Sequence, residues 1–469
     1  MTINNHDEMR EKPKQYRAGT LVYSRMGLLA VCSWLLWGDF VFQLMDVVAS
    51  SFIPLKLKYL DAPNWLLGLF VTTVPSLVGI TVAPAISVAS DRTRSRMGRR
   101  IPYLIYGTPF MTLFLLMLGF SDELAAWLQT ILFVNSTPTQ VALWLAGALV
   151  VGFQFFNIYI TNIYYCLFND VIPPEFLSRF LALFRVVTIL ATAGFQYFLF
   201  GLAETHMKEI FVGSSLLNGL VFLLMCIFVK EGTYPPPPER TEKKSGLIYH
   251  IRTYLRECFT NRLYWYFFLA NTFWGISLAV VSFRVFFAQS VGISLEQFGK
   301  LMGVVGITSA ILLYPAAALA DRWHPLRVMI LGMSLLSLVV PLQLVFVFMD
   351  VPLELSSKIY AGLFTLHIVV QVLFNAAQMP MFMRILPHER FAQFNSANGV
   401  IFSLAMILAG ALSGAWLDWL DARTADPLYH YRYLPVWVSS CLALCLVFLI
   451  LLYKEWKKYG GDKNYEPPQ

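Results

Sequence analysis

Long apolar runs separated by short polar segments recur twelve times along the chain. A helix that crosses the hydrocarbon core of a bilayer needs roughly 20 apolar residues, and each run is long enough to supply them. The pattern therefore predicts an all-α membrane protein with twelve transmembrane helices. The predicted helices span residues 26–50, 64–90, 101–120, 139–166, 178–203, 210–230, 262–289, 296–320, 326–349, 356–383, 396–418 and 433–453.

The composition is that of a protein solvated mostly by lipid. Of its 469 residues, 57% are hydrophobic and only 13% are charged, whereas a soluble domain carries about 25% charged residues. The first 25 residues are polar and lack the apolar segment of a secretory signal peptide. We therefore expect an integral, multi-pass membrane protein without a cleaved leader.

The positive charges gather on one side of the predicted membrane. The twelve-helix map places 26 of the 35 lysines and arginines on the side of the two termini, seven on the opposite side and two within helices. Cytoplasmic loops carry such an excess, so we expect both termini in the cytoplasm and the protein in the plasma (inner) membrane. The net charge of +7 is then an orientation signal, and nucleic acid is not an expected partner.

Two features recur in the two halves of the chain. Five arginines lie within residues 91–100, and a shorter Asp-Arg loop occupies residues 320–327. Residues 170–182 align with residues 384–396 at a constant offset of 214, because both contain apolar-Pro-x-Glu followed five positions later by Phe. Recurrence at equivalent loops indicates a duplication. We therefore predict two pseudo-symmetric six-helix bundles.

A polar segment divides the two predicted bundles. Residues 1–230 are predicted to form the N-terminal bundle with its tail, residues 231–261 a cytoplasmic linker, and residues 262–469 the C-terminal bundle with its tail. The linker contains four consecutive prolines at 235–238, which form a stiff, non-helical stretch. Apolar residues at helical spacing over 247–258 predict an amphipathic helix, either on the inner leaflet or packed on protein.

Polar side chains form stripes on the first, fourth, seventh and tenth predicted helices. Asp39, Gln43 and Asp46 follow i, i+4, i+7 spacing, which places them on one face of the first helix. Asp39 lies about 13 residues into that helix, roughly 20 Å along its axis and so near the middle of the membrane. A carboxylate there is costly unless it is neutralised, and a carboxyl that changes protonation is what proton coupling requires.

The first charged loop also carries a family resemblance. Asp-Arg-Thr-Arg-Ser-Arg-Met-Gly-Arg-Arg, from Asp91, resembles the loop between helices 2 and 3 of the major facilitator superfamily of transporters. The added residues and the later Pro102 look like the glycoside–pentoside–hexuronide and sucrose-type sugar symporters, which carry Trp in place of Met97. The loop that contains Asp170 and Glu175 is similar too.

The resemblance implies roles for the polar residues. In this superfamily, helices 1, 4, 7 and 10 line a central cavity, and these are the striped helices here. The implied solute contacts are Trp37, Gln43, Gln154, Asn157, Asn271, Trp274, Gln371 and Asn375. The charged loops are implied to form a conformational latch, with Asp91, Arg92, Gly98, Arg99, Arg100, Asp321 and Arg322. Anchoring by the positive-inside rule alone would explain the arginines but not Asp91.

Two further residues are candidates for proton coupling. Arg284 enters the seventh helix at the depth of Asp46, so we hypothesise an ion pair between them that forms and breaks during the transport cycle. His367 on the tenth helix is a second candidate, although a lone histidine more often packs between helices.

These observations predict a secondary active transporter that moves a small polar solute, a sugar or glycoside, by alternating access. The proton is favoured over sodium because melibiose-type sodium symporters use aspartates in helix 2, and residues 64–90 contain no acidic residue. A facilitator or exporter of another solute and a substrate-sensing membrane receptor remain alternatives. Metal-ligand spacing, nucleophile elbows and phosphate loops are missing from the sequence, so we predict neither an enzyme nor a metal or other cofactor. We expect a monomer whose partners are the bilayer, the solute and the coupling ion.

Overall fold

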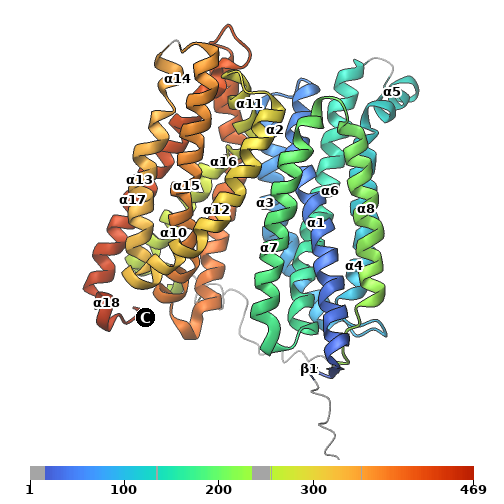
Figure 1. Cartoon of the computed structure of the whole chain (residues 1–469), viewed down its shortest axis with the longest axis vertical. Helices are drawn as coiled ribbons and strands as arrows, with labels where there is room; N and C mark the ends of the chain where they lie inside the picture. Colours follow the sequence, from blue (N-terminus) through green and yellow to red (C-terminus); the bar gives the residue numbers. More distant parts are fainter. Residues whose placement is uncertain (1–15, 134–135, 235–253, 255, 350, 469) are drawn as a thin grey trace, which may run out of the picture.

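A computed structural model describes residues 16–133, 136–234, 254, 256–349 and 351–468. Within these residues, twelve helices are long and apolar enough to cross a membrane, which confirms the predicted all-α membrane fold. Figure 1 shows them as two bundles, one containing α1 to α8 and the other α10 to α17. The predicted proline run and most of the predicted amphipathic helix at 247–258 lie outside the described residues.

The first bundle, the N half, opens with a small antiparallel hairpin before its first helix. Its elements are β1 (Tyr16–Ala18), β2 (Leu21–Tyr23), α1 (Arg25–Tyr59), α2 (Asn64–Gly68), the π-helical η1 (Leu69–Thr73), α3 (Val74–Arg92), α4 (Ile101–Gly119), α5 (Ser121–Ile131), α6 (Pro138–Val171), α7 (Pro174–Phe198), η2 (Phe200–Glu204) and α8 (Met207–Phe228). The second span therefore consists of α2, η1 and α3 in succession.

The second bundle, the C half, repeats the plan with a broken seventh span. Its elements are α10 (Arg262–Leu278), η3 (Val281–Phe283), α11 (Arg284–Ser290), α12 (Leu295–Trp323), α13 (Pro325–Leu342), α14 (Val345–Phe348), α15 (Leu353–Ile385), η4 (His388–Arg390), α16 (Phe391–Asp421), η5 (Tyr429–Tyr433), α17 (Leu434–Lys458) and α18 (Gly461–Asn464).

The helices run further than the apolar pattern predicts. Helix α1 was predicted to end at residue 50, but it continues to Tyr59 and carries Lys56 and Lys58 in its last turn. Long basic side chains lay their stems along apolar surface and place the charge in water. Hydropathy alone therefore underestimates helices that extend past the hydrocarbon core.

The two halves pack closely at the end remote from the chain termini, where α2 meets α16 and α7 meets α12. A Cβ on Gly68 would overlap the carbonyl oxygen of Gly410, and one on Gly303 of α12 would overlap the carbonyl oxygen of Ala193 on α7. Only glycine allows backbones to approach this closely.

Five hydrogen bonds between residues that the structure describes join the halves at the same remote end. The Asp418 carboxylate accepts from the backbone N–H groups of Asn64 and Trp65, both at 2.8 Å. The Asn64 side chain contacts the Tyr431 hydroxyl at 2.6 Å and His430 Nε2 at 3.2 Å. The fifth bond runs from Thr73 Oγ1 to the carbonyl of Ile407, at 2.7 Å. We call these contacts, together with Gly68 and Gly410, the closure.

On the side of the termini, the part of the chain that the structure describes contributes no hydrogen bond or ion pair between the halves. The described ion pairs there join residues of the same half or, at Arg390 and Glu257, the C half to the end of the linker. Among the described residues, the hydrogen bonds between the bundles are therefore confined to the closure.

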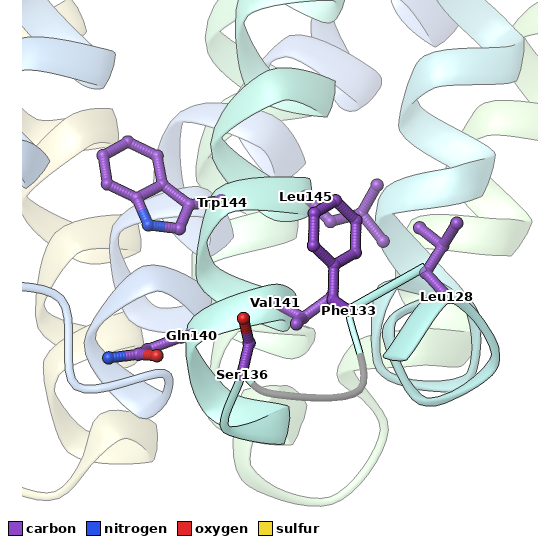
Figure 2. Close-up of a pocket in the computed structure, with 7 residues that line it drawn as sticks. All are labelled: Leu128, Phe133, Ser136, Gln140, Val141, Trp144 and Leu145. Carbon is purple, nitrogen blue, oxygen red and sulfur yellow. The ribbon is translucent and has the colours of Figure 1, made fainter. Parts of the chain in front are cut away.

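A separate apolar pocket of about 430 Å³ lies where α5 ends and α6 begins. Figure 2 shows that uncharged side chains line it, with Ser136 and Gln140 as its polar members. The nearby Trp127 and Trp144 are about 60% exposed, as is usual for aromatic residues at a membrane–water boundary. This pocket contains none of the predicted site residues.

Candidate functional site

Asp39 lies in the middle of α1 with its side chain fully buried. Gln43, one turn later, donates to Oδ1 at 3.2 Å, and the Thr188 hydroxyl of α7 lies 3.5 Å from Oδ2. No cation forms an ion pair with Asp39 in the described chain. A buried carboxylate that has only neutral partners is costly, and it accepts a proton readily for that reason.

Asp46 extends the same face toward the closure. It is half-buried, and Asn157 on α6 donates to its Oδ1 at 2.9 Å. The hydroxyl of Tyr165 on α6 lies within electrostatic range of Asp39, Asp46 and Arg185. The structure therefore brings both predicted carboxylates together between α1, α6 and α7.

Two members of this group were not predicted as site residues. Arg185 of α7 lies within electrostatic range of Tyr165, and it makes no hydrogen bond or ion pair with a described residue. Thr188 follows it by three positions on α7. A charged residue within a membrane-spanning helix was the signal that could have identified this stretch.

The C half contributes an amide network across three helices. Asn271 of α10 donates to Oδ1 of Asn398 at 3.2 Å, and Gln378 of α15 donates to Oδ1 of Asn271 at 2.9 Å. Asn398 lies on α16 and was not predicted as a site residue. Asn375 on α15 is exposed.

Four buried amide oxygens, on Asn157, Gln196, Asn218 and Gln371, have no hydrogen-bond partner among the described residues. Two of these four are related by the internal repeat. They are Oδ1 of Asn157 on α6 and Oε1 of Gln371 on α15. The two residues are separated by 214 positions, which is the offset of the internal repeat. The halves therefore present unpaired acceptors at equivalent positions, and a buried polar atom left unpaired requires an explanation.

The remaining predicted contacts differ in exposure. Gln154 is half-buried, and Trp37 is 50% exposed and stacks on Phe40 with ring centroids 5.6 Å apart. Trp274 is only 5% exposed and packs against Phe374, at 4.3 Å between centroids. In this structure Trp274 is a packing residue, because a ring so covered presents little surface to a solute.

The predicted ion pair between Asp46 and Arg284 is not formed in this structure. Asp46 bonds Asn157, whereas Arg284 lines a cavity inside the C half together with His367. The physical reason is the break at η3, which changes the direction of side chains after Val281–Phe283. Depth along a helix predicts distance from the membrane surface, but it does not predict orientation around the helix axis.

The first charged loop forms a compact cluster on the side of the termini. Arg99 and Arg100 both bond the carboxylate of Asp170, and Arg100 also bonds Asp91 and the hydroxyl of Ser90. These hydrogen bonds from Arg99 to Asp170 raise the pKa of the guanidinium further above its usual value. Asp91 thus has an ionic role that topological anchoring would not require.

Glu231, just after α8, completes this N-half charge cluster. Its carboxylate accepts from the backbone N–H groups of Arg99 at 2.9 Å, Arg100 at 2.7 Å and Ile101 at 2.6 Å. It therefore caps the start of α4, where a carboxylate is favoured by the free N–H groups and the helix dipole. Gly98 has φ of 109°, and a Cβ there would collide with Glu231. Glu231 was not predicted, because its partner is distant in sequence.

The ion pair of the second charged loop is longer and more exposed than those that Asp170 forms in the first loop. Asp321 and Arg384 are 3.8 Å apart, both with largely exposed side chains. Arg384 aligns with Asp170 in the repeat, so the charges of the two halves are reversed at this position. Arg92 and Arg322 are exposed and form no ion pair with a described residue. In this structure they lie outside both clusters.

Groups of three or more His, Cys, Asp or Glu side chains that could hold a metal ion do not occur in the described part of the chain. The polar side chains around Asp39 and Asp46 and in the C-half amide network are carboxyls, amides and hydroxyls, together with Arg185. These groups exchange protons and hydrogen-bond a polar solute, and they do not form a nucleophilic catalytic set.

Comparisons with known proteins agree with this architecture. The Major Facilitator Superfamily profile matches residues 160–339 and 272–467. No curated protein matches the chain. Among solved structures, a variant of the nucleoside transporter NupG is 10% identical with a TM-score of 0.66, over 90% of this chain and 100% of that chain.

Two other solved structures show the same fold. A bacterial homologue of the human lysosomal transporter Spinster, inward-facing and occupied, is 14% identical with a TM-score of 0.63, over 94% of this chain and 98% of that one. A D-xylose–proton symporter is 14% identical with a TM-score of 0.57, over 90% and 96%. With its twelve spans and two six-helix halves, the chain belongs to the Major Facilitator Superfamily and is a membrane transporter rather than an enzyme.

Proposed function

We propose that this transporter is a proton-coupled symporter for a sugar or glycoside. The observation that carries the proposal is the pair of unpaired amide oxygens on Asn157 and Gln371. They occupy equivalent positions in the two halves, and a hydroxyl-rich solute between the halves would donate a hydrogen bond to each. The resemblance of residues 91–102 to sugar symporters supports the same solute class.

Asp39 is the proposed coupling acid. It is buried, its partners Gln43 and Thr188 are neutral, and it has no ionic partner among the described residues. Protonation would remove the cost of a charge in the membrane interior. Asp46 shares this face of α1 and is bonded to Asn157, so the protonation state of the acids and the solute-binding amide are linked through one hydrogen bond.

The closure and the charged loops define the proposed conformational cycle. With both termini in the cytoplasm, as the lysines and arginines indicate, the closure lies at the outer face and the conformation faces inward. The N-half charge cluster would hold the inner ends of α3, α4 and α6 in register while the halves move. Residues 231–261 would form the linker that connects the two moving halves.

The proposal is tested by uptake of labelled solutes into liposomes that contain the purified protein. The panel contains mono- and disaccharides, glycosides and a nucleoside, each with an imposed proton or sodium gradient. We expect a sugar or glycoside to enter with the proton gradient. Uptake of the nucleoside alone, or of no sugar under either gradient, would refute the solute assignment.

Matched variants distinguish the loss of a solute contact from a general effect on the fold. Asn157→Ala and Gln371→Ala should each weaken apparent solute affinity by about tenfold, because a hydrogen bond to a neutral group contributes about 0.5–1.5 kcal/mol. Asn162→Ala is the control, because Asn162 lies on the same helix but bonds its own backbone at Ile158, at 2.7 Å. Equal loss in all three variants would contradict the assignment.

A further inference from the structure

A small cavity lies inside the C half. It measures about 20 Å³ and is lined by residues of the seventh, ninth, tenth and twelfth spans. Its polar lining consists of Arg284, Gln343, Tyr360 and His367. A cavity must offer about 10–15 Å³ to hold one water molecule, so this space admits a single small particle and excludes a sugar.

The polar groups that line the cavity are mostly donors. Gln343 Nε2 contacts His367 Nδ1 at 3.3 Å. An amide nitrogen only donates, so Nδ1 accepts and the imidazole proton resides on Nε2. Tyr360 is 1% exposed, and its hydroxyl makes no hydrogen bond with a described residue. The cavity therefore has a phenol and an imidazole N–H available, and no carboxylate lines it.

Arg284 adds an uncompensated positive charge. It is half-buried and forms no ion pair or hydrogen bond in the described chain, and it lies within electrostatic range of Tyr360 and His367. A guanidinium remains charged in proteins, and a cation within a membrane-spanning bundle is costly without a counter-charge. The one side chain predicted to pair with it, Asp46, is bonded to Asn157 in the other half.

We propose that this cavity is a binding site for one small monovalent anion, chloride, held by Arg284 and the Tyr360 hydroxyl. The donors, the unbalanced charge and the size of the space all select an anion of this kind. The site is separate from the proposed solute contacts and does not depend on the proposed function. Its occupant would neutralise Arg284 and join the broken seventh span to the tenth span.

The test is binding of radiolabelled chloride to the purified protein in nanodiscs of zwitterionic lipid, without solute. We expect saturable binding of about one chloride per chain. Arg284→Gln and Tyr360→Phe should each weaken it by at least about tenfold, since a hydrogen bond to a charged group contributes that much. Arg185→Gln is the matched control, because Arg185 lies on α7 of the N half and does not line this cavity, so the variant should bind chloride like the wild type.

A second readout covers the case in which Arg284→Gln does not fold. The wild-type thermal midpoint should be higher in chloride than in equimolar gluconate, which is too large for the cavity, and Tyr360→Phe should lose most of that difference. Equal midpoints in the two salts, absent binding by the wild type, or full binding by Arg284→Gln would each overturn the proposal and leave water as the occupant.

Discussion

The substitution Asp418→Ala tests whether the halves are held together at their remote end by one carboxylate. Helix α2 begins at Asn64, and the preceding Pro63 provides no side-chain cap. Asp418, from the other half, fills that role by accepting from the first two N–H groups at 2.8 Å each. The cap exists only while the halves touch, so its loss affects the closed arrangement and leaves each separate half unchanged.

The magnitude follows from the two hydrogen bonds. A hydrogen bond to a charged group contributes about 1.5–3 kcal/mol, and replacing a helix cap by alanine costs about 0.5–2 kcal/mol. Because water replaces the carboxylate when the halves separate, we take about 2 kcal/mol for the pair. A change of this size lowers the ratio of closed to open remote ends about 30-fold.

The assay is a spin-label distance measurement between the remote ends of the two halves, with labels at the exposed Thr205 and Ala422. Asp418→Ala should move the population from a short distance to a long one. Asp426→Ala is the control, because that side chain bonds only Leu428 of its own half. An unchanged distribution in Asp418→Ala, or an equal shift in both variants, would refute the reasoning.

Two further predictions concern the side of the termini. Asp170→Asn should lower the free energy of unfolding by about 3–5 kcal/mol, because it leaves two arginines without their nearly buried partner. Asp91→Asn should lower it less, because the Asp91 side chain is 55% exposed; chemical denaturation of both variants checks this ranking, and equal losses would contradict it. Burial lowers the pKa of His324, with the Arg384 charge as a second cause, so the unfolded chain binds more protons and stability should fall as the pH drops below about 6.5. His324 has φ of 82°, and its Nδ1 accepts a hydrogen bond from the Leu326 N–H. His324→Asn keeps a residue that tolerates this backbone and can cap the helix, so it should flatten the pH dependence of the thermal midpoint. An unaltered slope would show that another group titrates.

The fold could be predicted from hydropathy because lipid forces every span to be a long apolar helix. The same logic located the duplication, since equivalent loops repeat at one offset. It underestimated α1, whose last turn carries Lys56 and Lys58 beyond the apolar run. Outside the hydrocarbon core, a helix can continue with polar residues as it does in a soluble protein. The length of the apolar run therefore does not predict where such a helix ends.

The site was predictable only as far as one helix determines it. Asp39 and Gln43 are one turn apart, and their contact follows from spacing alone. Contacts between helices, such as Glu231 with the start of α4, depend on tertiary packing. The ion pair between Asp46 and Arg284, which was hypothesised to form and break during the cycle, is not formed in this structure and stays a prediction.

The central claim is that Asp39 couples proton movement to solute movement. It is tested most directly by recording internal pH and labelled sugar together in proteoliposomes, for the wild type and for Asp39→Asn. We predict that sugar entry acidifies the wild-type vesicles, whereas Asp39→Asn exchanges sugar across the membrane with no pH change. Acidification retained in Asp39→Asn, or sugar entry by the wild type without acidification, would contradict the account.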